Sequence, residues 1–144
     1  MNSKTRVQLS VMMFLQFFIW GSWYVTLGSY LGKIGFSGTE VGDVYSTVAL
    51  AAIIAPLFVG MIADRFFSAQ RVLAFVHLLG GGLLLWASQL QTPSEFYWVI
   101  LLYSICYMPT LAIANAVAFY QMENPEKQFP LIRVLGTIGW IVAG

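Results

Sequence analysis

The chain has 144 residues, of which 59% are hydrophobic and 9% are charged, with a formal net charge of +1. Mean hydropathy is +0.78, whereas a typical soluble domain carries about 25% charged residues. A water-soluble domain is therefore excluded, and so is nucleic-acid binding, because no basic face can neutralise a phosphate backbone. The single cysteine, Cys106, permits no internal disulfide, and we expect it to serve in packing.

The ionisable residues do not suit an enzyme or a metal protein. One histidine, His77, and six scattered acids do not offer the several converging ligands of a metal site, so we expect neither a metal nor a cofactor. A catalytic triad would have one candidate base and no neighbouring acid to orient it. His77 lies inside an apolar run, where it acts either as a proton relay or as a neutral, hydrogen-bonded interior side chain.

Four long apolar runs, separated by clusters of charges, follow one another along the chain. Asp, Glu, Lys and Arg are absent from residues 7–31, 44–63, 72–90 and 96–120. A helix needs about 20 residues to cross the hydrocarbon core of a bilayer, and each run is about that long. The runs predict an all-α polytopic protein of the lipid bilayer, with transmembrane helices over residues 7–31, 40–63, 72–90 and 94–120.

The two ends of the chain need separate interpretation. The last apolar run, residues 134–144, is shorter, and we interpret it as part of a truncated fifth helix over residues 131–144. The polar segment before the first run resembles the start of a signal peptide. The run that follows is too long for a signal peptide and no cleavage site follows it, so we expect the first helix to be retained.

Two polar segments mark helix starts. Ser37 and Glu40 have the spacing of a capping box, in which each side chain accepts a hydrogen bond from the other residue's backbone N–H. Residues 92–95, Thr-Pro-Ser-Glu, repeat that spacing and place Pro93 at the first helical position, where its missing N–H costs nothing.

Lysine and arginine are distributed unequally between the connections. The first and third connections hold only Lys33. The N-terminal segment and the second and fourth connections hold Lys4, Arg6, Arg65, Arg71, Lys127 and Arg133. Because cytoplasmic loops carry the excess of these residues, the N-terminus is predicted to lie in the cytoplasm.

The runs also contain residues that allow neighbouring helices to approach closely. They are Gly21, Ser22, Gly28 and Ser29 in the first run, and Gly80, Gly81 and Gly82 in the third. Pro109 leaves the Ile105 carbonyl without its helical partner, which is expected to bend the fourth helix. These features suit helices around a cavity and equally a tight bundle without one.

The connection between the second and third runs holds Gly60, then Asp64 and Arg65, and then Arg71. This order of a glycine, three residues, an acid and a base resembles the loop signature of the major facilitator superfamily. The resemblance implies that Gly60, Asp64 and Arg65 form a charge latch on the cytoplasmic face. Phe67 departs from the pattern, because a second glycine is usual there, and the alternative is an ordinary basic loop.

Three further segments resemble one branch of that superfamily, the bacterial nucleoside:proton symporter family. They are FLQFFIWGSWYVTLGSYL, YMPTLAIANAVAFY and FPLIRVLGTIGWI. The family implies twelve helices in two six-helix halves, with the substrate site between them. By this resemblance the chain is an N-terminal part of the first half. The whole transporter, including the missing C-terminal half, would move a nucleoside and a proton across the bacterial inner membrane by alternating access.

The resemblance also implies a set of site residues on the fifth helix. In the family this helix presents an arginine, a threonine and an aromatic residue to the nucleoside, and the matching positions are Arg133, Thr137 and Trp140. Their spacing places them on one helix face. The alternative is that Arg133 is an anchor that snorkels to water, Thr137 bonds the backbone and Trp140 packs. The coupling acids are implied to lie in the second half.

Further alternatives remain open. Asn115 either donates to a substrate or bonds between helices, and Gln16, Trp20 and Trp23 either line a cavity or pack. A major facilitator transporter of another solute, such as a sugar, is a second possible function. A four-helix membrane scaffold that transports nothing is a third.

Overall fold

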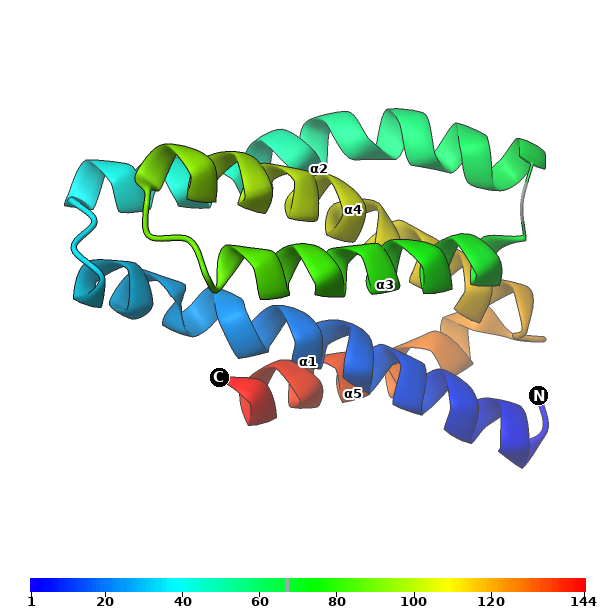
Figure 1. Ribbon diagram of the computed structural model, residues 1–144. Coiled ribbons are helices and arrows are strands. Elements are labelled where there is room, and N and C mark those ends of the chain that lie inside the picture. The colour runs from blue at the N-terminus through cyan, green and yellow to red at the C-terminus, as the bar shows by residue number, and fades with distance from the viewer. Residues whose placement is uncertain (67) are drawn as a thin grey trace. The chain divides into compact units, whose positions relative to one another are not determined.

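The computed structural model describes residues 1–66 and 68–144, and the side chains of residues 58–60 and 62–67 lie outside that description. Helices account for nearly all of the described residues (Figure 1). They are α1 Ser3–Lys33, α2 Gly38–Phe66, α3 Ala69–Ala87, α4 Pro93–Tyr120 and α5 Pro125–Ala143. The all-α organisation predicted from the apolar runs is confirmed.

Four segments within the described residues are long and apolar enough to cross a membrane. They are Ser3–Lys33, Gly38–Leu57, Ala69–Ala87 and Pro93–Tyr120. Large apolar side chains such as Leu78 and Leu85 are exposed on these helices. Exposed apolar side chains are unfavourable in water but match the hydrocarbon of a bilayer.

The fifth helix begins at Pro125 rather than at the predicted residue 131. Asn124 is its N-cap, because the Asn124 side-chain oxygen accepts a hydrogen bond from the Lys127 backbone N–H at 3.4 Å. Pro125 then occupies the first helical position, which requires no N–H. The charged segment that suggested a loop is therefore the polar first turn of α5.

The third helix also differs from the predicted 72–90. It covers Ala69–Ala87, and its C-cap is Ser88, whose backbone N–H donates to the Leu84 carbonyl. The next two backbone N–H groups, of Gln89 and Leu90, donate instead to the carbonyls of Trp86 and Ala87, both at 3.0 Å. An i→i−3 bond of this kind replaces the α-helical bond and ends the helix before the apolar run ends. Hydropathy alone does not indicate where such a bond forms.

The predicted capping box at the start of α2 is confirmed. The Ser37 backbone N–H donates to Glu40 Oε2 at 2.7 Å, and the Glu40 backbone N–H donates to Ser37 Oγ at 3.3 Å. Just before it, Gly35 has a φ of 96°, a conformation that favours glycine. At the next predicted box, α4 begins at Pro93 as expected, while the reciprocal side-chain bonds of that box stay a prediction.

The chain divides into two units. The first unit comprises Met1–Tyr30 and Ala114–Gly144. In this unit α1 and α5 run side by side (Figure 1), and the rings of Phe119 and Phe129, 4.4 Å apart, join the end of α4 to α5. Met13 and Ile132 are fully buried.

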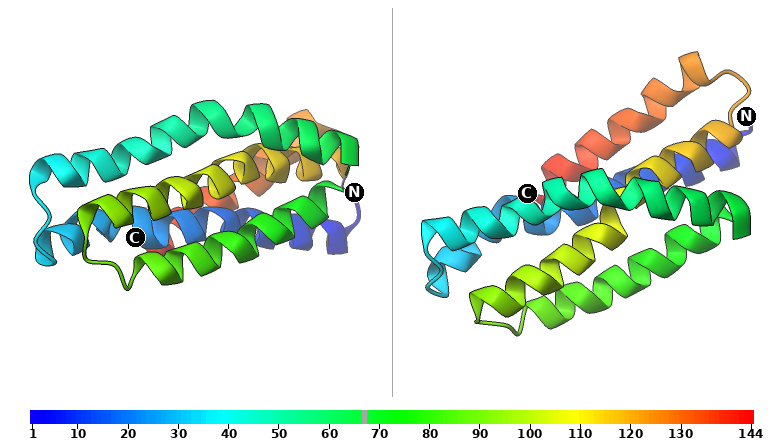
Figure 2. Two further views of the ribbon diagram at one scale, coloured as in Figure 1. Left: turned by 45° about the horizontal axis from the view of Figure 1, so that its top comes forward. Right: turned by 90° about the horizontal axis from the view of Figure 1, so that it is seen from above.

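The second unit comprises Leu31–Ile113, in which α3 runs alongside the first part of α4 (Figure 2). A Cβ atom at Gly80 would lie 3.3 Å from the Tyr103 ring, whereas Gly81 and Gly82 have nothing within 4 Å. The close approach predicted for the three glycines therefore occurs at Gly80 within the described part of the chain. Tyr103 and Ile100 fill the core of this unit.

Two threonine hydroxyls in the second unit bond within their own helices. Thr47 is fully buried and its hydroxyl donates to the Val44 carbonyl at 2.6 Å. The Thr110 hydroxyl, next to Pro109, donates to the Tyr107 carbonyl. Such bonds satisfy buried hydroxyls without a second helix.

Candidate functional site

The three predicted site residues of α5 share one side of the helix. A helix advances about 100° per residue, so Arg133, Thr137 and Trp140 project within about 60° of one another. Gly136 and Gly139 lie next to them in the helical projection. We call Gly136 and Gly139 the glycine strip of α5.

The glycine strip lies directly against α1. A Cβ atom at Gly139 would lie 2.2 Å from the Phe14 carbonyl oxygen, and one at Gly21 would lie 2.8 Å from the Trp140 carbonyl oxygen. No side chain fits between backbones at such distances, so glycines are required on both helices. Of the four small residues predicted to allow packing on α1, Gly21 provides this contact, while Ser22 and Ser29 are exposed.

The close crossing brings Arg133 onto an aromatic ring of α1. Arg133 Cζ lies 3.9 Å from the centroid of the Phe17 ring, within the range of a cation–π interaction. A Cβ atom at Gly136 would lie 2.9 Å from Arg133 Nη1. Arg133 therefore extends along α5 towards Gly136 and away from the polar first turn that begins at Pro125.

Trp140 lies in a cluster of aromatic rings. Its ring is 5.1 Å from that of Trp20, edge to face, and 5.9 Å from that of Tyr24. Phe17, Trp20 and Tyr24 form what we call the aromatic strip of α1. Arg133 and Trp140 both contact this strip, whereas Thr137, which lies farther round α5 from the glycine strip, is exposed.

The other singled-out residues of the first unit have different environments. Gln16 is buried, and Trp23 is half-buried, with its ring 5.6 Å from that of Tyr24. Asn115 is half-buried on α4. The packing interpretation therefore suits Gln16, and both interpretations still suit Trp23 and Asn115.

His77 belongs to the second unit and is half-buried. Its Nδ1 lies 2.8 Å from the Leu73 carbonyl oxygen, which can only accept, so Nδ1 carries a proton. The His77 ring also meets the Tyr107 ring edge to face at 6.1 Å. This geometry favours the hydrogen-bonded interior interpretation. Cys106 is half-buried, in keeping with a packing role.

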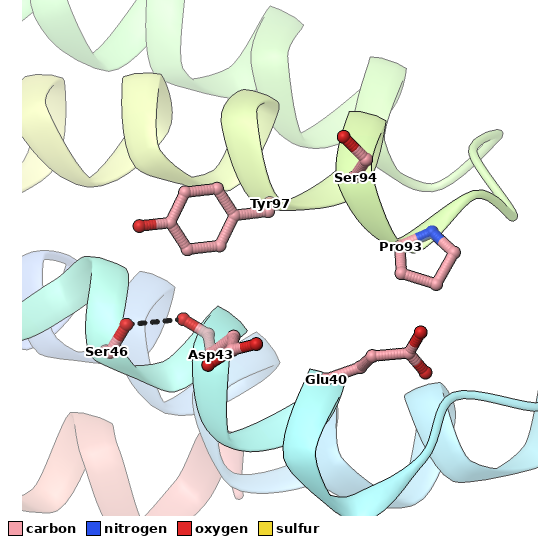
Figure 3. A pocket seen from close by; sticks show the side chains of 6 residues that line it. All are labelled: Glu40, Asp43, Ser46, Pro93, Ser94 and Tyr97. Atoms are coloured by element: carbon pink, nitrogen blue, oxygen red, sulfur yellow. Dashed lines mark hydrogen bonds between the residues drawn. The ribbon is translucent and has the colours of Figure 1, made fainter.

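A cavity of about 470 Å³ lies between the first turns of α2 and α4 in the second unit (Figure 3). It is lined by Glu40, Asp43, Ser46, Pro93, Ser94 and Tyr97. Two of its polar side chains serve their own helix, since Glu40 belongs to the capping box and the Ser46 hydroxyl donates to the Asp43 carbonyl at 2.6 Å. None of these lining residues is a cation. The stronger candidate site is therefore in the first unit, where the aromatic strip of α1 meets the side of α5 that carries Arg133, Thr137 and Trp140; we call this the α1–α5 face.

The predicted latch residues Gly60, Asp64 and Arg65 lie outside the residues whose side chains are described. Within the described residues, no three His, Cys, Asp or Glu side chains converge as metal ligands would.

Four residues of the α1–α5 face were missed by sequence reasoning. They are Phe17, Tyr24, Gly136 and Gly139. A signal was present in each helix, because Phe17 and Tyr24 are spaced i and i+7 around the singled-out Trp20, and Gly136 and Gly139 are spaced i and i+3. The pairing of one strip with the other depends on tertiary packing.

The chain is similar to known proteins over nearly its whole length. The profile of the family described as "Nucleoside H+ symporter" matches residues 3–144. The chain is 50% identical over 141 residues to YegT of Escherichia coli (strain K12), covering 98% of this chain and 33% of that protein. It is 44% identical over 142 residues to the xanthosine permease of the same organism, covering 95% of this chain and 34% of that protein.

A solved structure is similar as well. The crystal structure of the nucleoside transporter NupG matches with a TM-score of 0.92 at 41% sequence identity, covering 99% of this chain and 36% of that chain. The predicted polytopic fold of the major facilitator type is thereby confirmed for these residues. The chain spans about a third of the length of the curated relatives it matches.

Proposed function

This chain belongs to the nucleoside H+ symporter family, and from that premise we propose that the protein carrying it is a proton-coupled nucleoside transporter. It works by alternating access in the bacterial inner membrane, with the N-terminus in the cytoplasm. The names of the similar xanthosine permease and of NupG support a nucleoside as the substrate class. Transport of this kind requires substrate binding without covalent chemistry.

The observation that carries the proposal is the direction of the Arg133 side chain. An arginine that anchors a helix end extends towards the polar end of the helix, where its head reaches water. Arg133 instead places Nη1 beside Gly136, one turn farther from the polar first turn of α5. A cation held at that depth is costly in a bilayer and typically faces a ligand, a partner charge or a wet cavity.

The surrounding chemistry suits a nucleoside. The planar guanidinium of Arg133 offers paired N–H donors to the oxygens of a base or sugar. The Trp140 ring offers an apolar surface on which a base can stack. Thr137 is exposed on the same side of α5 and offers a hydroxyl that both donates and accepts. We therefore assign substrate binding to Arg133, Thr137 and Trp140.

Two parts of the mechanism are proposed on the resemblance alone. We propose that Gly60, Asp64 and Arg65 form the cytoplasmic latch between inward-facing and outward-facing states. Asp64→Asn should therefore change the accessibility of cavity cysteines to an external thiol reagent, and unchanged accessibility would remove the latch. We expect the coupling acids in the part of the relatives' length that this chain does not match.

The proposal is tested by uptake of radiolabelled uridine into cells that lack other nucleoside transporters. The complete protein from the native gene should concentrate uridine, a protonophore should abolish the concentration, and excess unlabelled xanthosine should compete while sucrose should not. Competition by sucrose alone would identify a sugar transporter, and no uptake of either solute would favour a scaffold.

The site assignment is tested in the same cells at matched membrane abundance. Arg133→Lys keeps the charge but loses the planar fork, so uptake should fall at least about tenfold if paired hydrogen bonds to the nucleoside are lost. Arg71→Lys, at an exposed position near the start of α3, is the matched control and should leave uptake unchanged. Wild-type uptake in Arg133→Lys would return Arg133 to the role of an anchor.

A further inference from the structure

Phe17 is the ring on which the Arg133 guanidinium rests. The separation of 3.9 Å between Arg133 Cζ and the ring centroid places the cation over the ring, where the negative face of the π system attracts it. Phe17 is half-buried, and its ring lies 6.3 Å from that of Trp20 within the aromatic strip. The ring therefore has neighbours that restrict its own movement.

Contact through the ring face leaves the hydrogen-bonding groups of Arg133 available. All five N–H donors of a guanidinium lie in its plane. A cation–π contact is not a conventional hydrogen bond, so Phe17 can hold the cation while the N–H groups that are directed away from the ring meet a ligand. Within the described residues, Arg133 has no carboxylate partner that would fix its orientation instead.

Gly136 makes room for this arrangement. A Cβ atom at this position would lie 2.6 Å from Phe17 Cδ2 and 2.9 Å from Arg133 Nη1. The ring and the guanidinium therefore share the space above one glycine, and the side chain of Arg133 is confined between Phe17 and the α5 backbone. A long, flexible arginine is thereby restricted to a small part of its rotamer range, which lowers the entropy lost when it binds a ligand.

We propose that Phe17 is a positioning residue, which holds the Arg133 guanidinium in the orientation that receives the nucleoside. The inference rests on the proposed function, because it requires Arg133 to bind the substrate. Phe17 itself need not touch the nucleoside. Its effect passes through Arg133, so removing the ring should weaken substrate binding only while the arginine is present.

The test measures uridine uptake by the complete protein at matched membrane abundance and compares three substitutions. Phe17→Leu removes the ring and should raise the KM about tenfold with little change in the maximal rate. Phe17→Tyr keeps the ring and should stay within about twofold of the wild type. Phe18→Leu is the matched control, because Phe18 is also half-buried and its ring stacks on Phe14 instead. It should leave the KM unchanged.

A double substitution separates positioning from packing. In the Arg133→Lys protein, adding Phe17→Leu should change the KM much less than it does in the wild type, since the partner of the ring is already altered.

Equal KM effects of Phe17→Leu and Phe18→Leu, or a full effect in the Arg133→Lys background, would overturn the inference. A wild-type KM in Phe17→Leu with impaired Arg133→Lys would overturn the inference alone. Wild-type uptake in Arg133→Lys would instead overturn the site assignment of the proposed function.

Discussion

The two units of the chain contain buried polar groups in different arrangements. In the second unit, the hydroxyls of Thr47 and Thr110 bond carbonyls of their own helices, and the ring of Tyr103 fills the space beside Gly80. In the first unit, two helices meet backbone to backbone at Gly139 and Gly21. There the cation of Arg133 rests on a ring of the other helix.

The difference supports the proposed assignment of binding to the first unit. In the second unit the two threonine hydroxyls are satisfied within their own helices and require nothing from outside, although Ser104 Oγ is buried without a hydrogen-bond partner among the described residues. We therefore assign this unit a supporting role in the proposed transporter. A guanidinium that is held by a cation–π contact retains N–H donors for a ligand. The backbone contacts at Gly21 and Gly139, which we call the glycine crossing, fix the position of α5, the helix that carries Arg133. A binding site requires such rigid elements. We therefore expect substitutions in the second unit to change stability, and substitutions on the α1–α5 face to change transport.

The largest difference in stability is expected between two aromatic residues, one from each unit. Tyr103→Ala empties a position that is 2% exposed and should lower the free energy of unfolding by about 3–5 kcal/mol. Trp140→Ala truncates a half-buried ring and should cost less stability, yet it should abolish most uridine uptake. Heating the purified complete protein and measuring the remaining monodisperse fraction checks the first effect. Equal thermal shifts for both variants would contradict the division of roles.

Two glycine substitutions should differ in their effect on stability, because one glycine lies in the glycine crossing and the other on an open helix surface. Gly139→Ala places a methyl group against the Phe14 backbone, which cannot move aside like a flexible side chain, and should destabilise by about 1–3 kcal/mol. Gly82→Ala adds the same methyl group where nothing lies within 4 Å. It should be neutral or stabilise by up to about 1 kcal/mol. The same heating assay measures both, and a harmless Gly139→Ala would mean that the helices are farther apart.

The smallest effects are expected at the two helix caps. The Ser37 hydroxyl makes two bonds with Glu40, accepting from its backbone N–H at 3.3 Å and donating to its Oε2 at 2.9 Å, whereas the Asn124 side chain accepts one bond, from the Lys127 backbone N–H at 3.4 Å. Ser37→Ala should therefore cost about 1 kcal/mol and Asn124→Ala about 0.5 kcal/mol. Chemical unfolding of the complete protein in mixed micelles can resolve this order. A larger loss for Asn124→Ala would show that the longer bond is the stronger cap.

Most of the fold could be predicted from the sequence because a bilayer imposes a simple rule. Each span needs about 20 apolar residues, and the four runs meet that rule. The start of α5 was missed because Glu126 and Lys127 suggested a loop, although Asn124 followed by Pro125 is a typical helix start. Charged residues are compatible with a first turn at the membrane surface.

The packing faces could not be predicted in the same way. In a soluble helix the apolar residues mark the buried side, but a membrane helix is apolar on both its lipid-facing and its interior side. The sequence therefore predicted a small-residue surface on α1 without showing that Gly21, and not Ser22 or Ser29, would meet another helix. Likewise Arg133 and Trp140 were found through a family resemblance, while their contacts with Phe17 and Tyr24 became evident only in the folded chain.

The claim that the α1–α5 face binds the nucleoside is tested most directly by ligand protection of a cysteine. Thr137→Cys is placed in the complete protein after Cys106 and any other cysteine have been replaced by serine. Saturating uridine should slow its modification by a maleimide severalfold, and sucrose should not. Ser22→Cys, exposed on the side of α1 away from the aromatic strip, should react at the same rate with and without uridine. If uridine binds to the protein and the Thr137→Cys rate stays unchanged, the nucleoside does not occupy this face.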